Sequence, residues 1–432
     1  MLLLGIASSL LALAGTAVSH SVQLEPHRSL TKAAKISKRV ASGGLCGPDA
    51  GICEEGLCCS RGGVCGTGGE YCSAPGCQLS YGPACHGNIV PKGADTSKTP
   101  RPHFGNVPYG IDLRSCTIPG TIALTFDDGP YHYTNDLLDV LSKNGVRVTF
   151  FVTGVNGAKG PINEPSTGQP DTLRRMITEG HQIAGHSWSH EDMESITLDQ
   201  KHEQIIKNEI ALADVFGFFP TYYRPPYTGC GVDCIAELGT YGYHVANYNL
   251  DTKDWRDGIE QARQNYEAGV DGSDLNSAGI ITLAHDIHET TVHDLTQFMI
   301  DKAKLSGYEL VTVGECLGDP PGNWYRDANT GEPVGKRALQ EAVDKGSVLE
   351  KAKSKSSGTS LTAIPTQSGS SAHSTYGKAK PGGEANPVEG ISDFGEGVID
   401  SDHSQRASTM STGVPLGLYT IAAIFVSGVA ML

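Results

Sequence analysis

Between residues 112 and 318, short apolar runs alternate with segments in which apolar residues recur every three or four positions. The continuous runs predict buried strands, and the spaced segments predict helices that cover them. We expect strands at 121–126, 146–154, 181–185, 222–227, 243–250, 279–286 and 308–313. We expect helices at 132–145, 170–180, 198–217, 234–242, 258–269 and 293–307. This alternation predicts an α/β fold whose parallel sheet closes as a (β/α) barrel.

The patterns outside this region divide the rest of the chain. Residues 1–19 are apolar and end in Ala17-Val18-Ser19, which predicts a signal peptide. Residues 20–45 form a leader with a candidate second cleavage after Lys38-Arg39, and residues 46–85 are dense in cysteine. The further segments are a linker at 86–111, a short helical extension at 319–352, a Ser/Thr-rich stalk at 353–413 and an apolar tail at 414–432.

The apolar tail is barely long enough to span a bilayer, which needs ~20 apolar residues. No Lys or Arg follows it, and small polar residues precede it. This arrangement resembles a glycosylphosphatidylinositol (GPI) signal, with the lipid attached near Ser401–Ser408. The alternative is a tail-anchoring helix. We therefore expect a secreted protein of the cell surface that is GPI-anchored to the plasma membrane or transferred to the cell wall.

Charge and cysteine content narrow the partners and the compartment. The net charge of -15 argues against nucleic acid as the main partner. The chain has twelve cysteines, and an extracellular protein is expected to pair them as disulfides. Eight of them lie between Cys46 and Cys85. Of the other four, we expect Cys116–Cys316 to tie the two ends of the barrel and Cys230–Cys234 to close a local loop.

Five clusters of polar residues follow the expected strands, each at the carboxyl end. They are DDGP at 127–130, HSWSH at 186–190, RPPY at 224–227, DTKDW at 251–255 and HDIH at 285–288. Because the carboxyl ends of parallel barrel strands share one face, these clusters predict a common active site there.

The second cluster contains two histidines that could bind a metal ion. His186 and His190 are four residues apart, so on a helical turn both imidazoles would face the same way. Asp127 or Asp128 could supply a carboxylate ligand, and the other aspartate could accept a proton from water. The alternatives are histidines that merely cap or solvate a turn and an Asp-Gly turn with solvated carboxylates.

In this order, the motifs TFDDGP, HSWSH, RPPY, DTKDW and LAHD resemble those of NodB-type polysaccharide deacetylases, carbohydrate esterase family 4. The resemblance covers about residues 112–318. It implies a metal-dependent hydrolase on a distorted (β/α) barrel that removes acetyl groups from N- or O-acetylated sugars. It also implies one divalent metal ion, zinc or cobalt.

The resemblance assigns roles to individual positions. It implies that Asp127 is the catalytic base, that Arg224 orients this base, and that His285 is the general acid. A fixed cation at Arg224 would also keep Asp127 ionised. The remaining implied roles are metal binding by Asp128, His186 and His190, tuning of His285 by Asp254 or Asp251, oxyanion binding by the Tyr227 N–H, and an acetyl pocket with Trp255 and Leu283 as walls. His288 and His293 are further histidine candidates near His285, which could also be a structural histidine beside Asp286.

The cysteine spacing from Cys46 to Cys85 resembles that of a hevein-like chitin-binding module. The resemblance implies the pairs Cys46–Cys59, Cys53–Cys65, Cys58–Cys72 and Cys77–Cys85. Ser60 and Tyr71 match its sugar-binding positions, whereas Gly62 and Val64 replace aromatic residues. Since aromatic faces supply much of the contact in shallow sugar sites, we expect weak chitin binding or a structural role.

Together these features predict a monomeric chitin deacetylase that acts on chitin or chitin oligomers and yields chitosan and acetate. One alternative is a deacetylase of another polymer, such as acetylxylan or peptidoglycan. The other is a catalytically silent chitin-binding surface protein.

Overall fold

The computed structural model describes residues 38–157, 159–277, 279–335, 339–341 and 344. The expected signal peptide, most of the leader, the stalk, the attachment region Ser401–Ser408 and the apolar tail lie outside these residues. Among the helices that the structure describes, none combines the length and the hydropathy that a membrane span requires.

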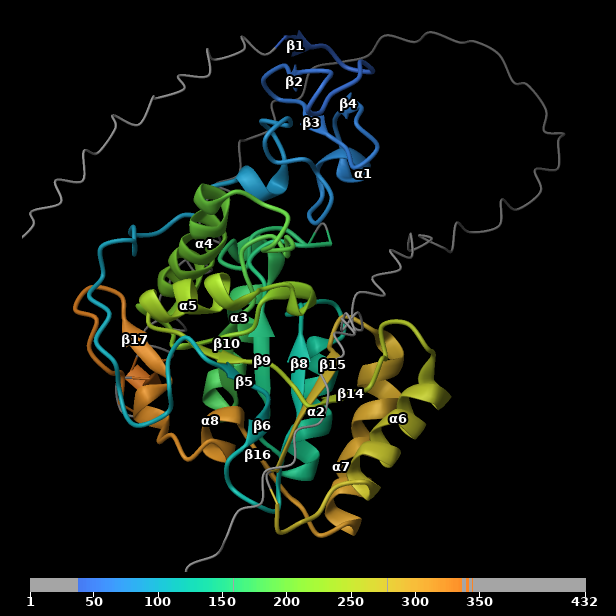
Figure 1. The fold of residues 1–432 in the computed structure, drawn as a ribbon, viewed down its shortest axis with the longest axis vertical. Coiled ribbons are helices and arrows are strands. Elements are labelled where there is room, and N and C mark those ends of the chain that lie inside the picture. The colour runs from blue at the N-terminus through green and yellow to red at the C-terminus, as the bar shows by residue number, and fades with distance from the viewer. Residues whose placement is uncertain (1–37, 158, 278, 336–338, 342–343, 345–432) are drawn as a thin grey trace, which may run out of the picture. The chain divides into compact units, whose positions relative to one another are not determined.

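An 11-stranded sheet forms the centre of the barrel domain (Figure 1). The expected strand 121–126 is present as two short strands, β7 and β8, which are interrupted at Leu124. The strand order is β16-β7-β15-β8-β9-β10-β12-β13-β5, with β14 and β6 paired to β15. The strands are β5 (Asp112–Leu113), β6 (Ser115–Cys116), β7 (Thr121–Ala123), β8 (Thr125–Asp127), β9 (Thr149–Val152), β10 (Gln182–Gly185), β12 (Tyr222–Tyr223), β13 (His244–Ala246), β14 (Leu250–Asp251), β15 (Gly279–His285) and β16 (Glu309–Val311).

The segment 112–116 closes the sheet into a barrel. Its first strand, β5, pairs in parallel with β13, and its second strand, β6, pairs antiparallel with β15. The other strand pairs of this sheet are parallel. The predicted distorted (β/α) barrel is therefore confirmed, and its distortion lies at the antiparallel β6 closure.

Helices follow the strands as the periodicity predicts. In α4, the Thr197 hydroxyl accepts the Gln200 N–H while the Gln200 side chain accepts the Thr197 N–H, and Gly217 in the left-handed region ends the helix. Helices α6 and α7 lie side by side (Figure 1). The helices of the domain are α2 (Thr134–Asn144), α3 (Gln169–Thr178), α4 (Leu198–Phe216), α5 (Val232–Thr240), α6 (Ile259–Asp271), the π-helical turn η4 (Thr291–Leu295), α7 (Thr296–Leu305) and α8 (Val313–Cys316).

The barrel domain continues beyond residue 318. Strand β17 (Tyr325–Asp327) pairs antiparallel with β11 (Phe218–Pro220), and Trp324 and Tyr325 are buried in the main core. Burial of these aromatic side chains explains why this segment packs on the barrel although the sequence placed it in a helical extension. Within that extension, residues 339–341 and 344 are helical.

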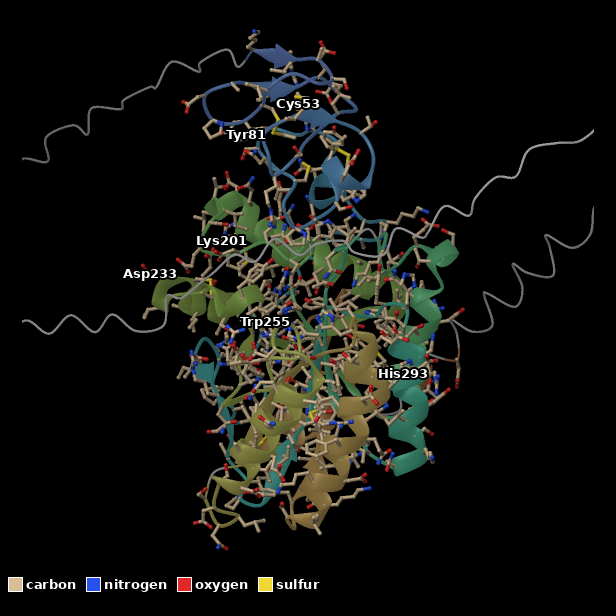
Figure 2. All side chains as sticks on the ribbon, turned by 90° about the vertical axis from the view of Figure 1, so that its right-hand side faces the viewer. Cys53, Tyr81, Lys201, Asp233, Trp255 and His293 are labelled. Atoms are coloured by element: carbon tan, nitrogen blue, oxygen red, sulfur yellow. A yellow bond between two sulfur atoms is a disulfide. The ribbon has the colours of Figure 1, made fainter. Side chains whose placement is uncertain are left out.

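The N-terminal module is built from short elements that disulfides hold together. Figure 2 shows Cys53 and Tyr81 in this module, with the disulfides as yellow bonds. All six predicted cysteine pairs are present, two of them in the barrel domain. The module's elements are β1 (Arg39–Val40), β2 (Ile52–Cys53), β3 (Cys58–Cys59), β4 (Cys65–Gly66), α1 (Gly69–Cys72) and the 3₁₀ turn η1 (His86–Asn88). Because β1 pairs with β2, the end of the predicted leader belongs to the module.

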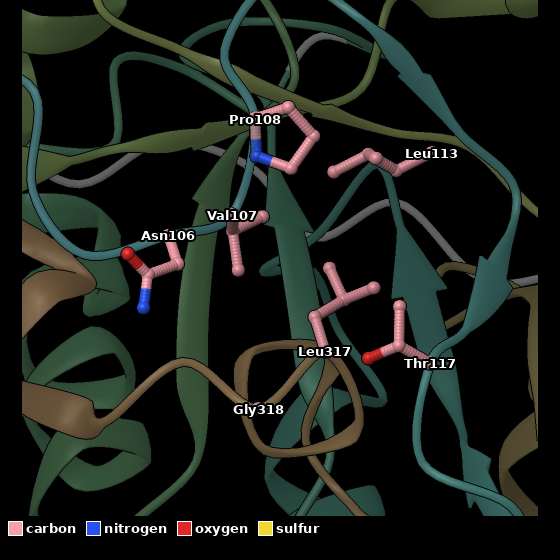
Figure 3. A pocket seen from close by; sticks show the side chains of 7 residues that line it. All are labelled: Asn106, Val107, Pro108, Leu113, Thr117, Leu317 and Gly318. Atoms are coloured by element: carbon pink, nitrogen blue, oxygen red, sulfur yellow. The ribbon is translucent and has the colours of Figure 1, made fainter. Parts of the chain in front are cut away.

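A small cavity of about 140 Å³ lies in the barrel domain, away from the predicted site residues. Figure 3 shows the side chains of Pro108, Leu113 and Leu317 around it. Its lining contains none of the residues to which the sequence assigns chemistry, so we assign it no role.

Candidate active site

The DDGP turn places two aspartates at the end of β8 with different surroundings. Asp127 is the last residue of the strand, whereas Asp128 has a φ of 79° in the left-handed region. The Asp128 N–H donates to the Phe151 carbonyl, and its own carbonyl accepts from the Thr153 hydroxyl. These bonds stabilise a strained turn, and they let the two adjacent carboxylates have different roles.

Asp128 and the two histidines converge on one point. The Asp128 Oδ1 atom lies 3.1 Å from His190 Nε2 and 3.5 Å from His186 Nε2. The three ligand atoms lie within 4.8 Å of one another, and all three residues are of a type that binds zinc. The Asp128 Oδ1 atom is buried and has no hydrogen-bond partner among the described residues. Because such an atom is costly to bury, this donor set fits a divalent metal ion.

The protonation of these residues suits metal binding. Burial lowers the pKa of both His186 and His190, so their rings are neutral at neutral pH. The Arg224 carbonyl lies 2.6 Å from His186 Nδ1, which must therefore carry the ring proton and leaves Nε2 free as a ligand. Burial raises the pKa of Asp128, but the basic groups around it, which are three histidines and Lys159, outweigh burial and bring this pKa down to about 2. The carboxylate is thus ionised.

The expectation that the two histidines lie on a helical turn is wrong. Residues 186–190 form an irregular loop, in which Ser187 and His190 have positive φ values of 70° and 55°. The imidazoles nevertheless come together, with ring centroids 5.1 Å apart. Hydrogen bonds fix this loop, because Ser187 Oγ accepts the His190 N–H and Gln204 Oε1 accepts the Ser189 N–H. Tertiary contacts thus replace the helical spacing.

Arg224 holds Asp127 as predicted. Its Nη1 atom lies 2.8 Å from Asp127 Oδ1 and also donates to the Thr125 hydroxyl. The guanidinium is buried over the Phe151 ring, and it donates further bonds to the backbone carbonyls of Ala246, the last residue of β13, and of Asn247. Burial raises the pKa of Asp127 to about 7, although Arg224 acts against this rise. Arg224 alone therefore does not keep Asp127 fully ionised at neutral pH, but the carboxyl group is poised to exchange a proton there.

His285 and Asp254 form a second pair at the end of β15. His285 Nδ1 lies 2.8 Å from Asp254 Oδ1, and the His285 backbone N–H donates to Asp254 Oδ2. The Thr291 hydroxyl donates to the same oxygen. Although burial acts in the opposite direction, Asp254 raises the pKa of His285 to about 10, so the imidazolium form prevails at neutral pH. Of the two aspartates left open by the sequence, Asp254 is the partner of His285, while Asp251 accepts the Lys253 N–H.

The remaining predicted residues lie close in the chain or in space to the residues described above. The exposed ring of Tyr227 packs edge-on against His190, with centroids 4.6 Å apart, and its backbone is left-handed. Leu283 is buried in β15, two residues before His285, and Trp255 is exposed next to Asp254. The two other histidine candidates have different surroundings. The His288 ring lies 5.8 Å from the His285 ring, whereas His293 pairs with Asp136 on the surface.

Sequence reasoning missed Lys159, whose buried amine supports the DDGP turn. Its Nζ atom donates to the carbonyls of Asp128 and Gly129 and to the Thr153 hydroxyl, over 2.8 to 3.0 Å. The Asp286 carboxylate leaves no room for a side chain at Gly129. Lys159 lies in a loop outside the strand-end clusters, so only the buried contacts identify it.

These features suit a barrel hydrolase: an Asp-His-His donor set that fits a metal ion, a carboxyl group beside it that can exchange a proton, and an imidazolium paired with a carboxylate. The polysaccharide deacetylase family model matches residues 114–246. A chitin deacetylase of Colletotrichum lindemuthianum is 42% identical over 226 residues, which are 51% of this chain and 88% of that protein. A chitin deacetylase of Pestalotiopsis sp. is 43% identical over 237 residues, 54% of this chain and 76% of that protein. The solved structure of the Colletotrichum lindemuthianum chitin deacetylase covers 51% of this chain and 97% of its own, with a TM-score of 0.49.

The chain therefore belongs to the polysaccharide deacetylase family. It is a polysaccharide deacetylase, a hydrolase, as the motifs predicted.

Proposed function

We propose that this protein is a chitin deacetylase, which hydrolyses the N-acetyl groups of N-acetylglucosamine polymers and yields chitosan and acetate. The observation that supports this most is the convergence of Asp128, His186 and His190 beside the Asp127–Arg224 pair. The names of two similar proteins and the cysteine spacing of the N-terminal module favour chitin over acetylxylan or peptidoglycan.

The three ligands would hold one divalent metal ion, zinc or cobalt. When bound, this ion would supply Lewis acidity, which lowers the pKa of water and polarises a carbonyl group. Asp127 accepts the proton of the attacking water, and Arg224 keeps the carboxylate in place. As the tetrahedral state forms, the Tyr227 N–H donates to its oxygen, a contact typically worth ~2.7–4 kcal/mol. Leu283 and Trp255 would enclose the acetyl methyl group.

His285 completes the reaction. The C–N bond breaks as His285 donates its proton to the sugar nitrogen, because an unprotonated amine anion is a very poor leaving group. Asp254 holds the imidazolium in place through its two contacts with His285. Acetate and a free amine are the products.

Acetate release from chitin oligomers, measured beside acetylxylan, tests this proposal. We expect release from the chitin oligomers, a stop after chelation, and recovery with zinc or cobalt. Calorimetry should show at least ~100-fold weaker zinc binding for Asp128→Asn, since even outer-shell changes cost ~10–100-fold. Faster release from acetylxylan would favour the other-polymer alternative, and chitin binding without acetate release would favour a silent surface protein.

We also propose that the protein acts as a monomer at the cell surface and is held by a GPI lipid attached near Ser401–Ser408. The support is the apolar segment 414–432 together with the small and polar residues that precede it. A GPI-specific phospholipase should release the protein from cells. Retention after this treatment would point to a membrane helix or to attachment to the wall.

A further inference from the structure

The N-terminal module contacts loops at the edge of the barrel that carries the candidate active site. The Ala74 carbonyl accepts the Gly157 N–H at 2.8 Å, in the loop after β9. Gly87 packs so closely against Ser189 that a side chain at this glycine would collide with the serine hydroxyl. Two more hydrogen bonds join the module to α4, from Gln200 to Ser80 and from Lys207 to the Gly87 carbonyl.

Two of the contacted loops belong to the site itself. Ser189 lies between the ligands His186 and His190. Gly157 follows Asn156, whose side chain accepts the hydroxyl of Thr153, the residue that bonds the Asp128 carbonyl. The module therefore packs against the segments that position the metal ligands.

Arg61 is a charged residue of the module close to these contacts. Its side chain lies over Gly76, two residues after the Ala74 contact. The Arg61 charge is near enough to Glu191 and Tyr227 to act electrostatically on both side chains. Glu191 follows His190 in the chain and the Tyr227 ring contacts His190, so Arg61 acts on two neighbours of a candidate metal ligand.

The Arg61 guanidinium is available to a ligand. The residue is exposed, and within the part of the chain that the structure describes its guanidinium has no hydrogen-bond or ion-pair partner. A guanidinium offers five N–H donors and no acceptor, which suits sugar hydroxyl and acetyl carbonyl oxygens. The neighbouring residue is Gly62, where an added side chain would meet only the Ser60 hydroxyl at 3.9 Å, so no aromatic ring occupies this position.

We propose that the N-terminal module forms part of the substrate-binding surface and that Arg61 donates hydrogen bonds to a sugar unit next to the one that is deacetylated. This inference rests on the proposed function. It makes Arg61 a specificity residue for chain length, because a longer oligomer reaches Arg61 while its acetyl group lies at the metal site. The module then acts in the same binding event as the barrel, whereas a loosely tethered anchor would act apart from it.

Kinetics on a disaccharide and a pentasaccharide of N-acetylglucosamine test this inference, with full-length zinc-loaded enzyme. For Arg61→Ala, we expect KM for the pentasaccharide to rise on the order of tenfold, the usual scale for a charged hydrogen bond. The preference for the pentasaccharide should shrink accordingly, and Arg61→Lys should lose less. The control is Arg39→Ala, which removes an exposed arginine of the same module that pairs with Glu55. An unchanged preference in Arg61→Ala, or an equal change in Arg39→Ala, would overturn the inference.

Binding without turnover separates this inference from the proposed function. In the Asp127→Asn background, calorimetry should show that Arg61→Ala weakens pentasaccharide binding about tenfold. Arg61-dependent binding by a wild-type enzyme that releases no acetate would overturn the proposed function and leave the inference standing. Normal acetate release with binding that does not depend on Arg61 would overturn the inference only. If the enzyme shows neither pentasaccharide binding nor acetate release, both the proposed function and the inference are overturned.

Discussion

Two carboxylate–cation pairs lie at the candidate active site, and burial affects them differently. Asp127 has one hydrogen bond among the described residues, from Arg224, and its pKa rises to about 7. Asp254 accepts three hydrogen bonds, two from His285 and one from Thr291, and its pKa falls below the ordinary value although burial acts in the other direction.

Charge and hydrogen bonding together explain the difference. At Asp254 the His285 charge and the three hydrogen bonds outweigh burial, whereas at Asp127 burial and the adjacent Asp128 charge outweigh Arg224 and His285. A buried carboxylate with few donors takes up a proton readily, whereas one with several donors stays ionised and stabilises a neighbouring cation. Asp127 can therefore exchange protons as a base, and Asp254 serves as a fixed anion that keeps His285 protonated. Environments that separate the pKa values of neighbouring groups in this way assign the acid and the base of a reaction.

Replacement of the proposed base, Asp127, should have the largest effect on kcat. Asp127→Asn keeps the size of the side chain but cannot accept a proton, so we expect kcat for acetate release to fall ~100- to 10,000-fold. Zinc binding, measured by calorimetry, should remain within a few fold of wild type, because Asp128, His186 and His190 are intact. The control is Asp233→Asn, an exposed aspartate at the start of α5. Residual kcat above one tenth of wild type would remove Asp127 from this role.

Loss of the fixed anion should alter the pH profile as well as the rate. Asp254 raises the pKa of His285, so Asp254→Asn should lower this pKa. The acid form of His285 would then be lost at a lower pH, and the basic limb of the kcat profile should move toward neutral pH. We also expect kcat to fall ~10- to 100-fold at the optimum, within the usual range for a positioned proton donor.

Asp251→Asn is the matched control for this variant, because Asp251 bonds the Lys253 backbone and not His285. Its basic limb should coincide with that of wild type. If Asp251→Asn moves the basic limb and Asp254→Asn does not, the assignment of the two aspartates is reversed.

The motif resemblance implied that Arg224 pairs with Asp127 and left His285 with Asp254 or Asp251 as its partner; the motifs themselves can be found because strand ends and polar clusters are local features. Asp127 and His285 are the last residues of β8 and β15, and Asp128 and Arg224 directly follow β8 and β12. In a parallel barrel these ends share one face, so the convergence follows from topology. The resemblance to a hevein-like module implied four of the disulfide pairs, and the extracellular setting led us to expect the other two.

The sequence could not predict features that depend on long-range contacts. The left-handed residues Ser187 and His190 replace the expected helical turn, since their loop is held by Gln204 from α4. Lys159 supports the Asp128 turn from a loop without any motif. The β11–β17 pair extends the domain because segments about a hundred residues apart pack together. Local propensity carries no information about such partners.

The smallest effect on kcat is expected from a substitution of Thr291, whose hydroxyl donates the third hydrogen bond to Asp254. Thr291→Val removes one hydrogen bond of 2.7 Å while it keeps the shape of the side chain. Asp254 then retains its two bonds from His285, but its negative charge is less stabilised, and the pKa of Asp254 should rise slightly. We expect kcat to fall only a few fold, in line with one hydrogen bond of about 1 kcal/mol. The neighbouring Thr290→Val is the control, because Thr290 is exposed and its side chain makes no capping bond. If kcat of Thr291→Val falls as far as kcat of Asp254→Asn, the Thr291 hydroxyl, and not the two bonds from His285, fixes the Asp254 carboxylate. If Thr291→Val and Thr290→Val have equal kcat values, the two bonds from His285 are sufficient.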